Sequence, residues 1–304
     1  MAIKMKDEYK KYIPDWVYDK TGSYDLLLTD DLDSLMGCAI LKAVMGWDIQ
    51  QVMLFKADPH KTTDYLGKTS KATKEVIGVD IALQDGKCFD NHVSRLQKTD
   101  HRNEQCINPN LWEDITRQNY FSKYNLSTVL LLWSIYDIPL PKSEDGKMIL
   151  LAIDGTYQSF YHENSQYNRR NKHWLVDVLG LNGLYECQQR HSKSDFEDIK
   201  RKYTMTQNGH DTKIKVSKGI LDTDLDLIGI NLAVGWDANI WCELPKDKFY
   251  LREKFHDIQM PLNKSIRYRE NLIDITENPF SVALTGRDFL CWSEMIKDDV
   301  QDGE

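Results

Sequence analysis

Short apolar runs recur along the first half of the chain and are separated by longer segments. The runs lie at 24–28, 49–55, 76–80, 87–89 and 148–154, and their length and composition suit buried strands. Two longer segments predict helices. The segment 34–45 is apolar almost throughout and should be buried on nearly all sides, and a second long helix is expected at 127–136. Because strands that alternate with helices and long crossovers pair in parallel, we expect an α/β fold with a mostly parallel sheet flanked by helices.

The second half of the chain has a different pattern. Residues 188–218 are polar and charged, which favours a helical, charged linker between domains. Apolar segments return at 228–236, 247–255 and 279–295, and they predict a smaller α/β unit. The 304 residues are enough for two domains with a substantial core. We therefore expect a larger domain at 1–187, the linker at 188–218, and a smaller C-terminal substrate-binding domain at 219–304.

Composition limits the classes of partner. Lys plus Arg is 39 and Asp plus Glu is 47, so the formal charge is 39 − 47 = −8. A protein with this balance does not coat duplex DNA, and a nucleic acid partner would need local basic patches or metal ions to offset the negative field. The six cysteines are far apart with no CxxC pair, which favours reduced, buried thiols over disulfides or a zinc site.

The sequence gives no sign of a membrane partner. No apolar run approaches the roughly 20 residues that are needed to cross a bilayer. The N-terminal stretch lacks the apolar core of a signal peptide. We therefore expect a cytoplasmic protein.

Acidic side chains follow the apolar runs where the predicted strands end. In a parallel sheet these carboxyl ends meet at one edge, which is where such folds bind ligands. Clustered carboxylates repel one another and are costly to desolvate, so a chain usually keeps them for metal ions, and we expect divalent cations here. The residues at these strand ends are Asp31 and Asp33, Asp80, Asp90 with His92, and Asp154.

A second explanation of these aspartates remains open. Aspartate also caps helices and forms turns, and Asp33 or the adjacent Ser34 stands where a helix cap is expected. On that explanation only a subset of the acidic residues meets at the edge of the sheet.

Four short motifs, in order, resemble motifs I to IV of the DHH phosphoesterase superfamily. They read LTDDLDSLMG, VIGVD, FDNH and LLAIDGTYQS, and INPNLW at 107–112 is similar to the Asn-Pro element that follows motif III in RecJ-like members. The superfamily includes RecJ-type single-strand exonucleases, nanoRNA and cyclic-dinucleotide phosphodiesterases, and family II pyrophosphatases. The resemblance covers 22–160.

This resemblance implies a two-metal phosphoesterase. It implies that Mn²⁺ or Mg²⁺, two ions in all, are held by the catalytic residues Asp31, Asp33, Asp80, His92 and Asp154. Asp80 would be the carboxylate shared between the ions, and His92 would be a ligand, a phosphate contact or a general acid. The favoured substrate is single-stranded nucleic acid or a short oligonucleotide, cleaved exonucleolytically. A small phosphoanhydride or a cyclic dinucleotide is the alternative substrate.

The chain also departs from the superfamily pattern. Asn91 stands where the Asp-His-His motif has its first histidine, and the histidine that often precedes motif I is absent. The glycine-rich, histidine-containing loop of many C-terminal substrate-binding domains is absent too. These departures motivate a third hypothesis, a degenerate member that binds a nucleotide or a protein partner without hydrolysis.

Basic and aromatic side chains alternate after the last motif, between 157 and 174. Such a mixture stacks bases and holds a single-strand backbone, although a solvated polar loop has the same composition. From this segment and motif III we expect Arg169, Arg170 and Asn91 to contribute to substrate binding.

Overall fold

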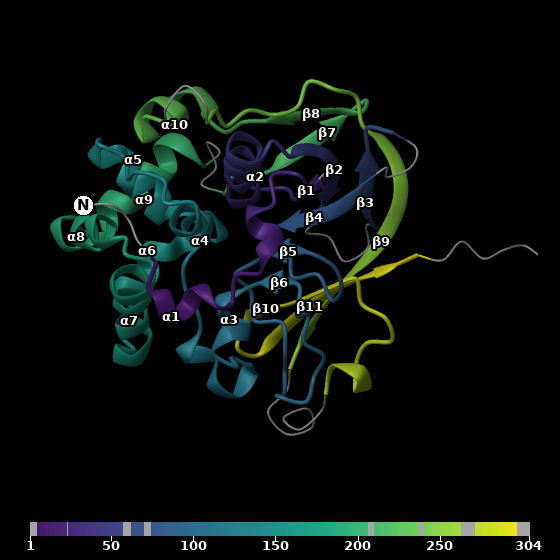
Figure 1. Cartoon of the computed structure of the whole chain (residues 1–304), viewed down its shortest axis with the longest axis horizontal. Helices are drawn as coiled ribbons and strands as arrows, with labels where there is room; N and C mark the ends of the chain where they lie inside the picture. The colour runs from purple at the N-terminus through teal and green to yellow at the C-terminus, as the bar shows by residue number, and fades with distance from the viewer. Residues whose placement is uncertain are drawn as a thin grey trace, which may run out of the picture.

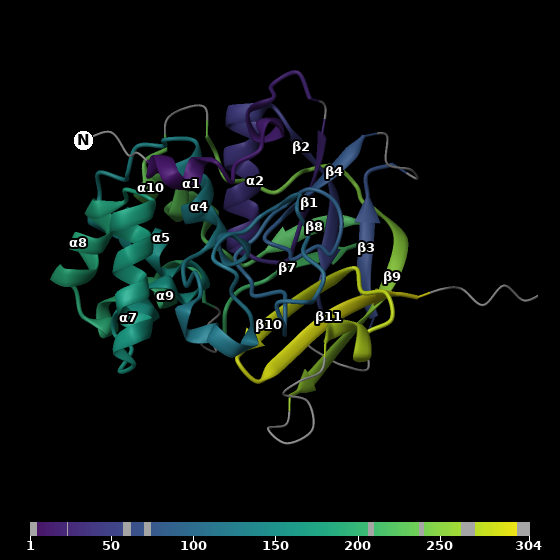
Figure 2. The same cartoon turned by 60° about the horizontal axis from the view of Figure 1, so that its bottom comes forward.

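The computed structural model describes residues 5–22, 24–56, 62–69, 74–205, 210–236, 240–262 and 271–296. Within these residues, nine strands form one mixed sheet in the order β10-β11-β9-β3-β2-β1-β4-β5-β6, and β7 and β8 form a separate hairpin. Figures 1 and 2 show most of the helices gathered on one side of the molecule and the sheet curling on the other. The predicted α/β class, with helices flanking a sheet, is confirmed.

One half of the sheet is parallel. Its strands are β2 (Asp48–Leu54), β1 (Tyr24–Leu28), β4 (Glu75–Val79), β5 (Cys88–Phe89) and β6 (Cys106–Ile107). The apolar runs predicted all of these except β6, which has only two residues. Because β1, β4, β5 and β6 run in the same direction, their carboxyl ends lie along one edge of the sheet.

The other half is antiparallel, so the sheet is mixed and the expected mostly parallel sheet is not confirmed. Its strands are β3 (Thr62–Gly67), β9 (Tyr250–Pro261), β11 (Phe289–Met295) and β10 (Ser281–Gly286). β9 is exposed at many of its positions. Antiparallel strands tolerate water on one face, whereas parallel strands are usually covered on both.

The C-terminal strands belong to the same sheet as the N-terminal strands. β9 pairs with β3, and β10 forms isolated bridges to Leu83 and Val93 in the segments that follow β4 and β5. Val93 also packs with Leu284 and Trp292 in one apolar cluster. The second, smaller domain predicted at 219–304 is therefore not confirmed, and the boundaries at 187 and 218 stay predictions.

Two buried helices lie beside the parallel strands, and the sequence predicted a helix at both places. α2 (Leu32–Met45) is buried at eleven of its positions and ends at Gly46, whose φ of 77° suits glycine. α4 (Thr128–Ile135) is buried at every position. The two helices pack against each other beside β1 and β4. This packing fixes the N-termini of both helices near the carboxyl ends of the strands.

The segment 148–154 is helical, so the strand predicted there is wrong. α5 (Glu144–Ala152) contains most of it, and a short 3₁₀ turn then carries Asp154. Ser143 caps the helix by accepting a hydrogen bond from the Gly146 N–H. A short apolar run is compatible with a buried strand or a buried helix segment, and here the cap at its start decides for helix.

Of the remaining helices, α6, α8, α9 and α10 pack against α5 (Figure 1). The bounds of the remaining helices are α1 Asp7–Lys10, α3 Pro109–Trp112, α6 Thr156–Phe160, α7 Ser165–Lys172, α8 Asn182–Arg190, α9 Lys193–Tyr203 and α10 Leu227–Val234. A π-helix spans His173–Val178. Short 3₁₀ turns lie at Asp15–Tyr18, Arg117–Ser122, Ile153–Gly155 and Leu272–Asp274. The separate hairpin comprises β7 (Ile214–Ser217) and β8 (Ile220–Thr223). The predicted linker thus contains α9 and β7, and α9 contributes Phe196 and Ile199 to the main core.

Two expectations from composition agree with the structure. No helix in the described ranges is both long enough and apolar enough to span a membrane. All six cysteines lie in the described ranges with free thiols, and all except Cys291 are buried.

Acid should selectively weaken the contacts of Glu144 at the start of α5. Burial would raise the pKa of Glu144, but hydrogen bonds from Arg190, Lys147 and His191 lower it from 4.5 to about 2. Because the folded-state pKa is depressed, this carboxylate stabilises the fold above pH 4.5, and the stabilisation is lost as the pH falls toward 2. Glu144→Gln should therefore lower Tm near neutral pH by on the order of 1–3 °C. Thermal unfolding over a pH series should show this difference shrinking in acid, and a difference independent of pH would contradict the assignment.

Candidate metal centre

The carboxyl ends of β1, β4 and β5 bring acidic side chains from separate parts of the chain to one edge of the sheet. Asp31 and Asp33 lie at the start of α2 directly after β1, and Asp80 follows β4. The Asp80 N–H donates to the Phe89 carbonyl at 2.8 Å, which joins the ends of β4 and β5. The convergence expected from the sequence is therefore present at these three strand ends.

Asp33 is fully enclosed and links α2 to α4. Its two carboxylate oxygens accept hydrogen bonds from the backbone N–H groups of Thr128 and Val129, at 2.8 and 2.7 Å. These donors belong to the first turn of α4, where the helix leaves its N–H groups without internal partners. Burial, followed by the charges of Asp80 and Asp154, raises the pKa of Asp33 well above its ordinary value. The capping role left open by the sequence thus applies to α4, while Asp31 caps α2.

Asp80 lies between the other acidic groups. It is 9% exposed and accepts a hydrogen bond from the Thr128 hydroxyl at 2.8 Å. Burial, and then the charge of Asp31, raises the pKa of Asp80 well above its ordinary value. Its φ of 59° lies in the left-handed region, which aspartate tolerates better than most residues. Such backbone conformations cluster at functional sites.

His92 is held by a buried carboxylate. Its Nδ1 lies 2.8 Å from Oδ1 of Asp90, and the Asn108 amide donates to Oδ2 of Asp90 at 2.7 Å. Burial lowers the pKa of His92, but the charge and hydrogen bond of Asp90, with the charges of Asp80 and Asp154, raise it to about 10. This pairing orients the ring and leaves Nε2 as the nitrogen that would bind a metal ion.

Asp154 joins the acidic cluster from the turn after α5, and not from the end of a strand. The Asn91 amide donates to its Oδ2 at 2.7 Å and to the Leu126 carbonyl at 3.1 Å. Asn91 is only 4% exposed, so it orients Asp154 and does not face solvent as a substrate-binding residue would. Protein surrounds the Asp154 carboxylate and raises its pKa, although an open cavity keeps it in contact with solvent.

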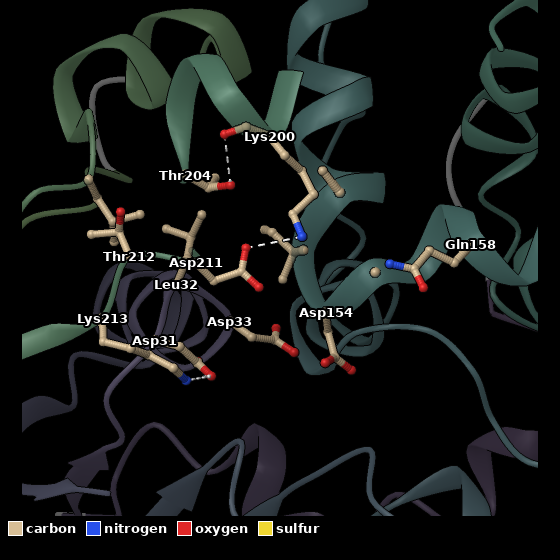
Figure 3. Close-up of a pocket in the computed structure, with 14 residues that line it drawn as sticks. Asp31, Leu32, Asp33, Asp154, Gln158, Lys200, Thr204, Asp211, Thr212 and Lys213 are labelled. Atoms are coloured by element: carbon tan, nitrogen blue, oxygen red, sulfur yellow. Dashed lines mark hydrogen bonds and ion pairs between the residues drawn. The ribbon is translucent and has the colours of Figure 1, made fainter. Parts of the chain in front are cut away.

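That cavity has a volume of about 330 Å³ and lies beside the carboxylates (Figure 3). Asp31, Asp33 and Asp154 line one part of its wall, and Lys200 and Lys213 line another. In Figure 3 the side chains of Asp33 and Asp154 occupy the same part of the cavity, and the Lys213 amine reaches Asp31. The cavity therefore combines acidic and basic groups.

Lys213 neutralises part of the acidic cluster. Its amine lies 3.2 Å from Oδ1 of Asp30 and 3.3 Å from Oδ2 of Asp31. The Ile214 N–H donates to the Asp30 carbonyl at 2.7 Å, which places the start of β7 here. The local sequence around these aspartates contains no cationic partner for them. In the structure Lys213, which is 182 positions after Asp31, takes this place.

The donor set suits divalent cations. Asp80, Asp90 and His92 each offer a ligand atom, and these atoms lie within 4.8 Å of one another. Carboxylate oxygens with one imidazole nitrogen are ligands that Mn²⁺ accepts, and an all-oxygen subset suits Mg²⁺. The mutual repulsion among Asp33, Asp80 and Asp154 is what bound cations would offset. Asp80, Asp90 and His92 therefore fit one such ion. Among the described residues, Asp31, Asp33 and Asp154 belong to no group whose ligand atoms all lie within this distance.

A second group of ligand atoms is less suitable. Glu144, Cys187 and His191 also lie within 4.8 Å of one another. The Glu144 carboxylate, however, already accepts hydrogen bonds from Arg190 at 2.6 Å and from Lys147 at 3.0 Å. Its charge is thus balanced without a metal ion.

The two arginines expected to bind substrate lie elsewhere, on α7. Arg170 pairs with Glu113, and its guanidinium lies 5.1 Å from the centre of the Trp174 ring. Arg169 is exposed and contacts Ser165 at 3.3 Å. Neither arginine is among the residues that line the cavity beside Asp154.

Several residues of the site were not predicted. Asp90 was placed at the edge of the sheet but was not assigned a role, and its contact with His92 spans only two positions, so the FDNH motif contained the signal. Thr128 and Lys213 are far from the aspartates in sequence, and their contacts depend on how α4 and β7 pack. No local sequence pattern indicates them.

Comparison with family models, with curated proteins and with solved structures found no match for this chain. The likeness to DHH phosphoesterases therefore stays a prediction from the sequence motifs. Function has to be inferred from the chemistry of these side chains, because unrelated functions share folds.

Removing one charge from the cluster should stabilise the protein in EDTA. Asp154→Asn keeps the oxygen that accepts from Asn91 and removes a charge that burial disfavours, since burial raises the pKa of Asp154. We expect Tm in EDTA to rise by about 1–3 °C, and the stabilisation produced by Mn²⁺ to fall. Asp137→Asn is the matched control, because Asp137 has the same φ of 51° and is exposed. An unchanged Tm in EDTA together with a full response to Mn²⁺ would contradict the role of Asp154.

Proposed function

We propose that the protein is a metal-dependent phosphoesterase that hydrolyses phosphodiester bonds in single-stranded nucleic acid or short oligonucleotides. One observation carries the proposal: side chains from four separate segments gather at one edge of the sheet, namely Asp33, Asp80, His92 and Asp154. Asp33 and Asp80 both accept hydrogen bonds from Thr128, the ligand atoms of Asp80 and His92 lie within 4.8 Å of each other, and Asp154 is held by Asn91, the residue before His92. Asp33 and Asp80 are buried, and buried carboxylates are costly to maintain unless they bind cations.

The chemistry of phosphodiester hydrolysis matches this donor set. The reaction needs an activated water and neutralisation of the charge on the phosphoryl oxygens, and two divalent ions supply both when bound. The protein holds each ligand by a second group: the first turn of α4 holds Asp33, Asn91 holds Asp154, and Asp90 holds His92. Ligands that are fixed in advance need no reorganisation when cations and substrate bind.

Two roles suit His92. Its Nε2 would bind a metal ion once the ring is neutral, or the protonated ring would donate a proton to the leaving oxygen. The carboxylates around the ring keep it protonated near neutral pH in the metal-free protein, since they raise its pKa to about 10. The proton is therefore available for donation in the metal-free site, and it would have to leave before Nε2 binds a metal ion.

The basic groups of the cavity suit a phosphate of the substrate. Lys213 and Lys200 both line the cavity, where Lys213 pairs with Asp31 at 3.3 Å and Lys200 pairs with Asp211 at 3.0 Å. Thr212, which is 4% exposed, has a hydroxyl without a hydrogen-bond partner in the described part of the chain. Ammonium groups and a hydroxyl donor are what a phosphate next to the scissile bond would contact.

The test is hydrolysis by the purified protein with Mn²⁺ or Mg²⁺. Labelled single-stranded DNA, short RNA, cyclic dinucleotides and pyrophosphate are offered, and we expect cleavage of the single strands that EDTA abolishes. Asp31→Ala and Asp80→Ala serve as variants, and both should lose activity. Cleavage by both variants at the parent rate would show that the activity lies elsewhere.

Two other functions have specific support. A cavity of about 330 Å³ suits a small ligand, which favours a cyclic dinucleotide or a phosphoanhydride as the alternative substrate. A degenerate DHH-type protein that binds its ligand without hydrolysis is favoured by two features. They are Asn91 in place of a histidine and the ion pair between Lys213 and Asp31. Tight binding with no turnover on any substrate would support that second function.

A further inference from the structure

A second cavity, of about 810 Å³, lies on the opposite face of the sheet from α2 and α4. It shares no lining residue with the cavity beside the carboxylates. Along β2 the side chains alternate, so Val52 packs in the main helical core while Met53 packs in the cluster on this second face. The lining residues are Gln51, Tyr65, Lys68, Val76, Tyr250, Leu251, Arg252, Glu253, Phe255 and Phe280.

Gln51 is the unusual group in this cavity. It is 1% exposed, and its Nε2 has no hydrogen-bond partner within the described ranges. Buried amide groups are almost always hydrogen-bonded. A buried donor without a partner has lost its hydrogen bond to water, and this loss costs free energy. A ligand in this cavity would explain the unpaired amide, because an acceptor on the ligand would take the hydrogen bond from Gln51 Nε2.

Aromatic rings form the wall next to Gln51. The ring centroids of Phe255 and Phe280 lie 4.9 Å apart. The centroid of Tyr65 lies 6.0 Å from that of Phe255 and 6.3 Å from that of Phe280. The ring planes are tilted by 43° and 52°, and Tyr65 and Phe280 meet at 86°, so a planar base would stack on one ring and contact the edge of a neighbouring ring. The wall therefore suits an aromatic heterocycle better than an aliphatic chain.

Two cationic side chains lie at the same cavity. Arg252 donates from Nε to the Thr69 carbonyl at 2.8 Å, and a Cβ at position 67 would collide with its guanidinium. Gly67 thus makes room for the guanidinium on β3. Lys68 lies 2.8 Å from Asp247. Positive groups fixed next to an aromatic wall are suited to the phosphate of a nucleotide.

We propose that this second cavity binds a nucleotide, independently of the metal centre. The base stacks on Tyr65 or Phe280, with the fully buried Phe255 packed against both rings, and an acceptor on the base receives a hydrogen bond from the Gln51 amide. The phosphate lies at Lys68 and Arg252. The same chemistry is offered by a free mononucleotide and by one unit of a single strand.

The test is calorimetric titration of the full chain in EDTA, so that the metal centre plays no part. AMP, GMP, CMP and UMP are compared with ribose 5-phosphate and with a hexanucleotide. We expect at least one nucleotide to bind about tenfold more tightly than ribose 5-phosphate, since the sugar phosphate lacks a base to stack. Equal affinity for mononucleotide and hexanucleotide identifies a free nucleotide as the ligand, and tighter binding of the hexanucleotide identifies a strand.

Three variants locate the ligand. Gln51→Met keeps the length of the side chain and should weaken binding of the preferred nucleotide about fivefold without lowering Tm, because it removes an unpaired donor. Lys68→Gln should weaken binding of the nucleotide but not of its nucleoside. Gln158→Leu alters the carboxylate cavity and should leave binding in EDTA unchanged.

Three results would overturn the proposal. They are no binding of any nucleotide or hexanucleotide, unchanged affinity in both Gln51→Met and Lys68→Gln, or loss of binding only in Gln158→Leu. The outcome is separable from that of the proposed hydrolysis, because the titration contains no divalent cation and measures no cleavage.

Discussion

Replacing Asp80 by asparagine is expected to lower metal-dependent phosphodiester cleavage by at least about 10²-fold. Asp80 is buried among the other ionised groups of the site, so removing its charge weakens cation binding more than removing an exposed charge would. Asparagine has the same size, tolerates the left-handed φ of 59°, and still accepts from the Thr128 hydroxyl. The measurement is kcat/KM on a labelled single-stranded oligonucleotide with Mn²⁺.

Asp137→Asn is the control for this substitution. Asp137 is exposed, has a φ of 51°, and follows α4 instead of a strand at the site. Its kcat/KM should stay close to that of the wild type. Equal rates for the Asp80 and Asp137 variants would place the activity outside the acidic cluster.

A chain that ends at Lys246 is expected not to fold cooperatively. The truncation removes β9, whose residues 250–256 pair with β3. It also removes the fully buried Phe255 from the cluster of Leu27 and Met53. It also removes β10 and β11, which pack on Val93. Exposing an apolar face of the central sheet costs more than the net stability of an ordinary domain.

Denaturant unfolding followed by circular dichroism measures this effect. The milder variant Arg117→Met tests the same contact, because Arg117 is 3% exposed and donates to the Leu262 carbonyl at 3.0 Å and to Asp288 at 2.8 Å. It should lower the free energy of unfolding by about 3 kcal/mol and leave a single transition. Cooperative unfolding of the truncated chain would instead support the separate C-terminal domain that the sequence predicted.

The parallel strands were predictable because their apolar runs are short and bounded by polar segments. β1, β2 and β4 fall within one residue of the predicted runs at 24–28, 49–55 and 76–80. The pairing of β9 with β3 was not predictable, since a pairing between strands so distant in sequence leaves no local pattern. The apolar segment at 247–255 was recognised, but β9 spans Tyr250–Pro261, and its pairing with β3 was not expected.

The site was predicted in part for the right reason. Asp33 and Asp80 meet because they follow neighbouring parallel strands, as the alternating pattern indicated. Asp154 reaches them from the end of α5, although a strand was expected there. The contact of Lys213 with Asp31 depends on a hydrogen bond between β7 and the loop after β1, and only the folded chain reveals it.

Anomalous scattering from crystals grown with Mn²⁺ tests the central claim most directly. The account predicts anomalous peaks bounded by Asp33, Asp80, His92 and Asp154, and their loss in crystals of Asp80→Asn. Crystals without peaks at that position, or with peaks only beside Glu144, Cys187 and His191, would contradict it.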